Sequence, residues 1–350
     1  MDYKILYIED LDADTRVLTL QKDYFIIEAI KPSKTIDLII NDINEKKPDL
    51  IILDYILTEG SDLKYCNAPT IASTLRSLIA TDSFIERPII LMSTQENIIA
   101  SYKKDYTSHD LFDYAITKEN ATKINTEKFI NRCISFINSY EKIKKLKFDI
   151  PLILQTSKET LHSKLFVYLN ENNQSLYEYS RFIYEHIIRC SGLLIGEDIL
   201  SARLGVSKNS KDWDKLLTLL ETQKYNGIFS DSYNRWWMAS IEKWWKDEIG
   251  SNYSLRHFTS EERIKILNKK LNLNLKAIQK SKNNFSTNYW VICKETKLPL
   301  DPINGLELLD EEFKAWQDKD YVSIDGYLND IEKYSKLVSE IDRKEMRNFK

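Results

Sequence analysis

Short apolar runs alternate with amphipathic stretches over roughly the first 145 residues of the chain. The apolar runs predict buried strands, at residues 3–9, 24–30, 49–54, 88–93 and 112–117. The stretches between them have helical periodicity, which predicts helices at residues 13–22, 34–46, 70–80, 95–104 and 126–145. Strands that alternate with helices form a parallel sheet covered on both faces. We therefore expect an α/β, doubly wound domain with five parallel strands.

Four of the apolar runs end in polar side chains, and these are Glu9 and Asp10, Asp54, Ser93 and Lys118. Ligands of open α/β sheets bind just beyond the carboxyl ends of the strands, so we expect the five side chains to meet in one crevice. Carboxylates are the ligands that Mg²⁺ prefers. An alternative role for Glu9 and Asp10 is to cap the helix that follows them.

In the order and spacing of these five positions, the region resembles the receiver domain of response regulators. The resemblance implies a flavodoxin-like fold and an Asp54 carboxylate that is phosphorylated by a histidine kinase or a small phosphodonor. It also implies that Ser93 and Lys118 contact the phosphoryl group. The implied ligands of Mg²⁺ are the carboxylates of Glu9, Asp10 and Asp54 and the backbone carbonyl of Ile56.

The chain departs from the family pattern at three places. Glu119 follows Lys118, where the family usually has proline, and the position three residues before the lysine holds Ala115, with Tyr114 beside it. The segment from Asp54 to Ser93 is about ten residues longer than in the family, with the surplus in residues 60–69. These departures leave the five polar positions intact, and they concern how the signal is passed on.

Helical patterns dominate after a charged stretch at residues 141–147. We expect a receiver domain over residues 1–147 and a mainly α-helical output or effector domain over residues 148–350. Two T-x-x-E capping boxes predict helix starts, at Thr156–Glu159 and Thr259–Glu262. Residues 289–293 form a short apolar run that predicts a strand.

Tryptophans recur eight residues apart in this second region, at Trp236 and Trp244 and again at Trp237 and Trp245. This spacing places each pair near one face of a helix. We favour a packed core or an interdomain seam. The alternative is a platform on which bases or nucleotides stack, with Arg235 and Lys243 beside it.

The composition limits the possible functions. A net charge of −3, from 50 basic and 53 acidic residues, gives no polybasic surface, so DNA binding is possible but disfavoured. The four cysteines lack metal-ligand spacing and suit a reduced, cytoplasmic setting. No apolar run approaches the ~18 residues of a membrane span, and no signal peptide is recognisable. The second region carries no separate catalytic signature.

The leading hypothesis is a response-regulator-like signalling protein in which Asp54, with Mg²⁺, controls an atypical C-terminal output module. Its own chemistry would be limited to phosphoryl transfer and autodephosphorylation. One alternative is a pseudo-receiver that acts as a protein-interaction adaptor or effector, in stress or defence. Another is a DNA-binding transcriptional regulator. The expected partners are a phosphodonor and a protein that binds the C-terminal domain, and homodimerisation is left open.

Overall fold

The computed structural model of the chain describes residues 2–11, 13–64, 66–81, 83–100, 102–104, 107–170, 175–281, 283–309 and 312–348. The chain forms two compact units, each built from three segments of sequence. The first unit comprises Met1–Ile153, Leu169–Ile183 and Gly227–Ser232. The second unit comprises Leu154–Tyr168, Tyr184–Asn226 and Tyr233–Lys350.

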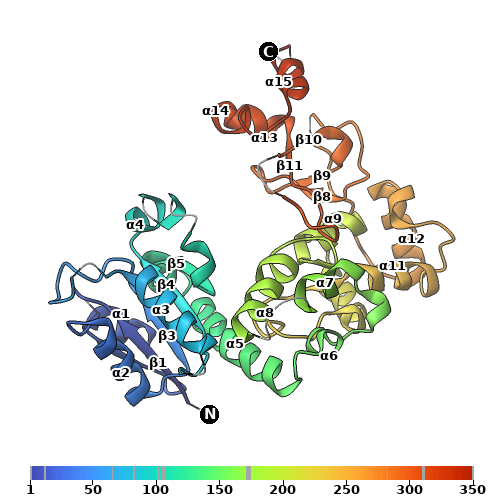
Figure 1. The fold of residues 1–350 in the computed structure, drawn as a ribbon. Helices are drawn as coiled ribbons and strands as arrows, with labels where there is room; N and C mark the ends of the chain where they lie inside the picture. Colours follow the sequence, from blue (N-terminus) through green and yellow to red (C-terminus); the bar gives the residue numbers. More distant parts are fainter. Residues whose placement is uncertain are drawn as a thin grey trace. The chain divides into compact units, whose positions relative to one another are not determined.

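A five-stranded sheet forms the centre of the first unit (Figure 1). All neighbouring strands are parallel, in the order β2-β1-β3-β4-β5. The strands are β1 (Tyr3–Ile8), β2 (Phe25–Ile30), β3 (Leu50–Leu53), β4 (Ile89–Ser93) and β5 (Tyr114–Thr117). This order is that of the flavodoxin-like doubly wound fold. The structure therefore confirms the expected fold and each of the five expected strands.

Helices cover both faces of this sheet. They are α1 (Asp14–Leu20), α2 (Ile36–Lys46), α3 (Ala68–Ala80), α4 (Gln95–Ala100) and α5 (Thr126–Lys145). Apolar side chains of α2, α3 and α4 pack with one face of the central strands into a single buried cluster. Helices α1 and α5 pack against each other on the other side of the sheet. Shorter turns complete the region, at η1 (Tyr102–Lys104), η2 (His109–Leu111) and η3 (Asn120–Ile124).

The first unit continues beyond the expected end of the receiver, because it also contains α8 (Leu176–Ile183) and residues 227–232. Two further helices lie where the chain passes between the units, α6 (Ile150–Leu154) and α7 (Ser163–Asn170). The boundary expected between residues 147 and 148 stays a prediction. In the structure the first division between compact units follows Ile153, and later segments return to the first unit.

The second unit is mostly helical, as expected. Its helices are α9 (Glu197–Leu204), α10 (Trp213–Leu219), α11 (Met238–Asp247), α12 (Ser260–Leu271), α13 (Ile324–Asn329), α14 (Ile331–Tyr334) and α15 (Glu340–Arg347). Its shorter turns are η4 (Lys158–Thr160), η5 (Tyr184–Ile188), η6 (Glu221–Gln223), η7 (Leu255–His257) and η8 (Pro302–Asn304). Its strands form three antiparallel pairs, β6 (Leu194–Ile195) with β7 (Trp236–Trp237), β8 (Val291–Ile292) with β9 (Pro299–Leu300), and β10 (Gly305–Glu307) with β11 (Tyr321–Ser323).

The tryptophans expected on one helix are divided between a strand and a helix. Trp236 and Trp237 form β7, whereas Trp244 and Trp245 belong to α11. All four are buried, at no more than 5% exposure, so they form core rather than a stacking platform. The single-helix prediction was wrong because Trp236 and Trp237 pair with β6, and this pairing overrides the helical spacing.

Of the two expected capping boxes, one is present. The Thr259 side chain accepts from the Glu262 backbone, and Glu262 binds back to the Thr259 backbone at the start of α12. The prediction at Thr156 was wrong, because a 3-10 turn begins there instead, with Ser157 before its first residue. The expected strand at residues 289–293 is confirmed as β8. Across the described ranges, no helix is both long and apolar enough to span a lipid bilayer.

Candidate phosphoacceptor site

The polar side chains predicted from the strand ends lie at the carboxyl ends of β1, β3, β4 and β5. Glu9 and Asp10 follow β1, Asp54 follows β3, Ser93 is the last residue of β4, and Lys118 follows β5. All five are at most 8% exposed. Ligand oxygens of Glu9, Asp10 and Asp54 lie within 4.8 Å of one another. The parallel sheet thus brings together three carboxylates that are far apart in sequence.

Lys118 joins two of these carboxylates. Its Nζ lies 2.7 Å from Asp54 Oδ2 and 2.7 Å from Glu9 Oε2. The same Glu9 oxygen accepts a hydrogen bond from the Tyr7 hydroxyl, and it lies 3.7 Å from Arg16 Nη1. The other Asp54 oxygen, Oδ1, accepts from the Tyr55 backbone amide at 2.8 Å. Each oxygen of the Asp54 carboxylate, the expected phosphoacceptor, therefore has a hydrogen-bonding partner.

The charges of this cluster suit a divalent cation. Lys118 contacts two of the three buried carboxylates, and Arg16 forms a longer ion pair with Glu9, so three negative charges face two positive ones. Within the described part of the chain, Glu9 Oε1 is buried without a hydrogen-bond partner, an arrangement that is costly unless a ligand satisfies it. Burial, and then the charge of Asp54, raise the pKa of Glu9 above its ordinary value. These residues fit Mg²⁺, a hard cation that takes carboxylate oxygens.

Asp10 also holds the long loop between β3 and α3. Its Oδ2 accepts hydrogen bonds from the backbone amides of Glu59 and Gly60, each at 2.8 Å. A Cβ on Gly60 would lie 2.3 Å from the Asp10 carbonyl oxygen, so the close approach requires glycine. Leu57 and Leu63 of the same loop are buried in the core beside the sheet. The residues that lengthen this loop are thus anchored at the acidic cluster.

The structure does not support a capping role for Glu9 and Asp10. Helix α1 begins at Asp14, its N-cap is Ala13, and among the described residues no side chain caps it. The hydroxyl of Ser93 accepts a hydrogen bond from Asn97 Nδ2 at 3.3 Å, with Asn97 on α4. The predicted roles of Ser93 and of the Ile56 carbonyl stay predictions.

Sequence reasoning missed three residues near the cluster. Tyr7 precedes Glu9 by two positions on an extended chain, so period-two alternation could have placed both on one side of the sheet. Arg16 and Asn97 gave no such signal. They reach the site from α1 and α4, and their positions depend on how those helices pack.

No family model and no curated protein matches the chain. Solved structures that resemble it include receiver domains of response regulators. A putative response regulator from Chloroflexus aurantiacus is 16% identical, with 39% of this chain and 99% of that chain covered and a TM-score of 0.29. The receiver domain of a putative LuxO repressor from Vibrio parahaemolyticus is 17% identical, with 42% and 98% covered and a TM-score of 0.29. The BeF3-activated receiver domain of Klebsiella pneumoniae RstA is 21% identical, with 38% and 97% covered and a TM-score of 0.26.

Matches at these identities and scores carry no inference about activity. The fold is identified by the chain itself, through the strand order 2-1-3-4-5, the parallel register and the helices on both faces. The first unit therefore has the flavodoxin-like fold of receiver domains, with a buried acidic cluster at the carboxyl ends of its strands.

Proposed function

We propose that the chain is a response-regulator-like signalling protein in which Asp54 accepts a phosphoryl group with the help of Mg²⁺. The observation that carries this proposal is the buried cluster of three carboxylates. In it Lys118 contacts Asp54, and one oxygen of Glu9 has no partner among the described residues. An ordinary surface carboxylate without a function would need neither burial nor an ion pair with a lysine that follows another strand.

The chemistry follows from the positions of these groups. A carboxylate oxygen of Asp54 attacks the phosphorus of a donor, which is a phosphohistidine of a kinase or a small acyl phosphate. The new P–O bond forms as the bond from phosphorus to the donor's nitrogen or oxygen breaks, and the donor leaves with that electron pair. Lys118, already on Asp54, offsets the negative charge that the product gains. Glu9, Asp10 and Asp54 would hold Mg²⁺, which would supply further charge neutralisation.

The strand register indicates how phosphorylation of Asp54 would be communicated to the rest of the chain. On β5, Tyr114 pairs with Ile90 and Ala115 pairs with Leu91. Leu91 and Ala115 pack into the cluster formed with α2, α3 and α4, so they face that side of the sheet. Successive side chains of a strand point to opposite faces. Tyr114 therefore faces α5, and the aromatic residue nearest to Lys118 on this strand lies on the α5 side.

Tyr114 begins a series of aromatic contacts that leads out of the sheet. The Arg132 guanidinium lies 4.6 Å from the centre of the Tyr114 ring and donates a hydrogen bond to its hydroxyl. Phe136, one turn further along α5, stacks with Tyr114 at a centroid distance of 6.5 Å. Phe136 in turn meets Phe229 edge to face at 5.0 Å. Phe229 belongs to the segment of residues 227–232, which returns to the first unit from far along the chain.

Polar contacts hold the same segment on α5. Asp231 accepts hydrogen bonds from the Ser135 hydroxyl and from Asn138 Nδ2. The Ser232 hydroxyl donates to the Asn131 carbonyl at 2.9 Å. Residues before and after this segment belong to the second unit. A change at β5 that reaches α5 would thus act on a segment joined covalently to the second unit, which we propose as the output route.

Helix α8 is attached to the first unit by a second set of contacts. The Glu86 carboxylate accepts from the Ser175 hydroxyl at 2.7 Å and from the backbone amides of Leu176 and Tyr177 at 2.9 and 2.7 Å. It therefore caps a helix that begins about ninety residues later in sequence. The Arg76 guanidinium lies 3.7 Å from the centre of the Tyr177 ring. Helix α8 runs directly into η5 of the second unit, so it offers a second covalent link.

Treatment of the full chain with acetyl phosphate and Mg²⁺ tests the proposal. We expect the intact mass to rise by one phosphoryl group, and reduction with borohydride to locate it at Asp54. The variant Asp54→Asn should show no gain, whereas Asp49→Asn, a neighbouring exposed carboxylate, should behave like the wild type. Absence of modification in the wild type, with Asp54→Asn identical to it, would sink the proposal.

Hydrogen exchange tests the output route separately. Binding of beryllofluoride with Mg²⁺ should change the amide exchange of residues 227–232, and Phe229→Ala should abolish that change without abolishing binding. An exchange response confined to α4, with none at residues 227–232, would leave phosphorylation intact but contradict the route.

A further inference from the structure

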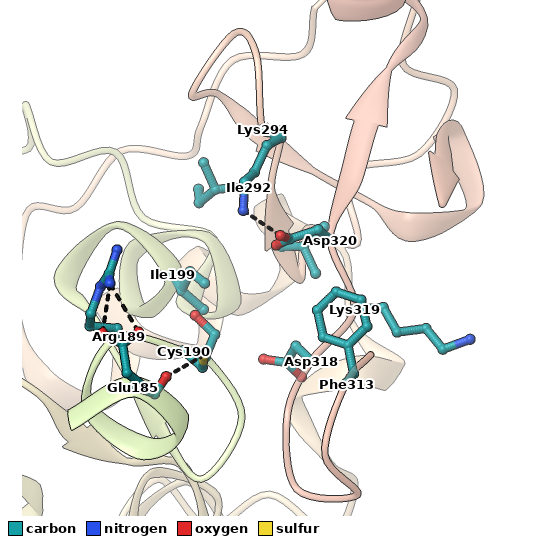
Figure 2. Close-up of a pocket in the computed structure, with 12 residues that line it drawn as sticks. Glu185, Arg189, Cys190, Ile199, Ile292, Lys294, Phe313, Asp318, Lys319 and Asp320 are labelled. Carbon is teal, nitrogen blue, oxygen red and sulfur yellow. Dashed lines mark hydrogen bonds and ion pairs between the residues drawn. The ribbon is translucent and has the colours of Figure 1, made fainter. Parts of the chain in front are cut away.

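A cavity of about 360 Å³ lies wholly within the second unit (Figure 2). One wall is formed by the end of η5 and the residues after it, from Glu185 to Ser191. The opposite wall is the loop from Phe313 to Asp320, and the floor is apolar, with Ile199 of α9 and Val291 and Ile292 of β8. A volume of this size is at the lower end of the range found for small-molecule sites.

Hydrogen bonds hold the two walls together at the base of the cavity. The Asp318 amide donates to the Ser191 carbonyl at 2.8 Å. The His186 carbonyl accepts from Trp316 Nε1 at 3.0 Å and from Gln317 Nε2 at 3.1 Å. Gly192 joins the walls with a φ of +143°, and a Cβ there would lie 2.0 Å from the Trp316 carbonyl oxygen. The cavity is therefore preformed by backbone contacts that no other residue at position 192 would permit.

Two carboxylates of the loop wall are oriented by basic partners. Arg203 is buried at 1% exposure, donates to the Trp290 carbonyl and pairs with Asp318 from behind. Lys294 pairs with Asp320 (Figure 2). Within the described residues, each of these carboxylates uses only one oxygen in an ion pair or hydrogen bond. The second oxygen of each can accept from a ligand.

The opposite wall offers donors. Arg189 binds both oxygens of Glu185 through a single nitrogen, Nη1, at 3.0 and 2.9 Å. Its other N–H groups make no hydrogen bond with the described residues. An acceptor group of a ligand can therefore bind there.

Each carboxylate that lines the cavity has one basic partner. Glu185 pairs with Arg189, Asp318 with Arg203 and Asp320 with Lys294, so a ligand with a large net charge would leave charge uncompensated in the cavity. A ligand that carries one positive and one negative group matches both walls, and an apolar remainder matches the floor and Phe313. We infer that this cavity binds a free amino acid with an apolar side chain. Its ammonium group would lie at Asp318 and Asp320 and its carboxylate at Arg189.

Calorimetric titration of the full chain tests this inference, with leucine, isoleucine and phenylalanine as probes. Leucine has two matched analogues, isoamylamine without the carboxylate and isocaproate without the ammonium group. We expect at least one amino acid to bind, and we expect leucine to bind about tenfold or more tightly than either analogue. No binding of any probe at millimolar concentration would overturn the inference, as would an analogue that binds as tightly as leucine.

Variants locate the site. Asp320→Asn and Arg189→Gln are changes at half-exposed or exposed positions, and each should weaken binding by about tenfold. Lys319→Gln is the matched control, because its side chain points away from the other labelled residues in Figure 2 and pairs with Glu307. Thermal unfolding without ligand checks that each variant is folded. Wild-type affinity in both Asp320→Asn and Arg189→Gln would show that binding occurs elsewhere and would overturn the inference.

Discussion

Removal of the Lys118 ammonium should make the first unit depend on Mg²⁺ for its stability. Lys118 lies 2.7 Å from both Glu9 and Asp54, and each carboxylate is almost fully buried. At an effective dielectric constant of about 20, one such contact has a Coulomb energy of about 6 kcal/mol, and desolvation of the lysine offsets much of it. Loss of one partner of a buried ion pair costs about 3–5 kcal/mol, because the other charge stays buried.

The variant Lys118→Gln should therefore lower the free energy of unfolding of the first unit by about 3 kcal/mol without Mg²⁺. For a unit of this size, this corresponds to a fall in Tm of about 10 °C. The extra negative charge should strengthen cation binding, and Mg²⁺ at about a hundred times its Kd restores about 2.7 kcal/mol. Lys46→Gln, which removes an exposed ion pair with Glu28, is the control and should cost less than about 1 kcal/mol.

Far-ultraviolet circular dichroism, combined with hydrogen exchange of β1, β3 and β5, measures this effect. Tryptophan fluorescence gives an internal comparison, because all seven tryptophans belong to the second unit. The reasoning would be refuted if Lys118→Gln unfolded at the wild-type temperature without Mg²⁺ and gained no more than the wild type when Mg²⁺ was added.

The remaining predictions concern Glu9, Gly60 and Glu86. The pKa of Glu9 is raised, so below that pKa Mg²⁺ must displace a proton in order to bind. Titration with Mg²⁺ should therefore show that the affinity drops as the pH falls through this pKa. The drop should be less steep in Glu9→Gln. Without Mg²⁺ the sign is opposite, and stability should rise as Glu9 becomes protonated. Gly60→Ala should cost about 1–3 kcal/mol in denaturant unfolding, because its Cβ would overlap the Asp10 carbonyl. Glu86→Gln should cost about 1 kcal/mol and speed amide exchange in α8, whereas unchanged exchange would contradict the capping role.

The sheet of the first unit could be predicted because its central strands β1, β3 and β4 are largely buried on both faces. Their apolar runs are then continuous and end sharply at polar residues such as Glu9 and Asp54. The acidic cluster followed from the same reasoning, since the carboxyl ends of parallel strands share one edge. The long loop was located by its extra length. Its attachment through Asp10 was not predicted, because backbone amides of Glu59 and Gly60 leave no mark in the sequence.

Contacts between distant segments account for most of what the sequence did not reveal. Glu86 caps α8, and Asp231 binds α5, across about ninety residues in each case. Neither pairing has a local pattern, and the helical spacing of the tryptophans was overridden in the same way by the pairing of β6 with β7. Local patterns thus identified the strands and the site, whereas long-range pairings decided which later segments complete the first unit.

Beryllofluoride binding is the most direct test of the central claim, that Asp54 is a phosphoacceptor assisted by Mg²⁺. Fluorine NMR of the full chain should show a bound beryllofluoride signal that requires Mg²⁺ and is absent in Asp54→Asn. A wild-type chain that gives no bound signal at saturating Mg²⁺, or a signal that persists in Asp54→Asn, would contradict the account.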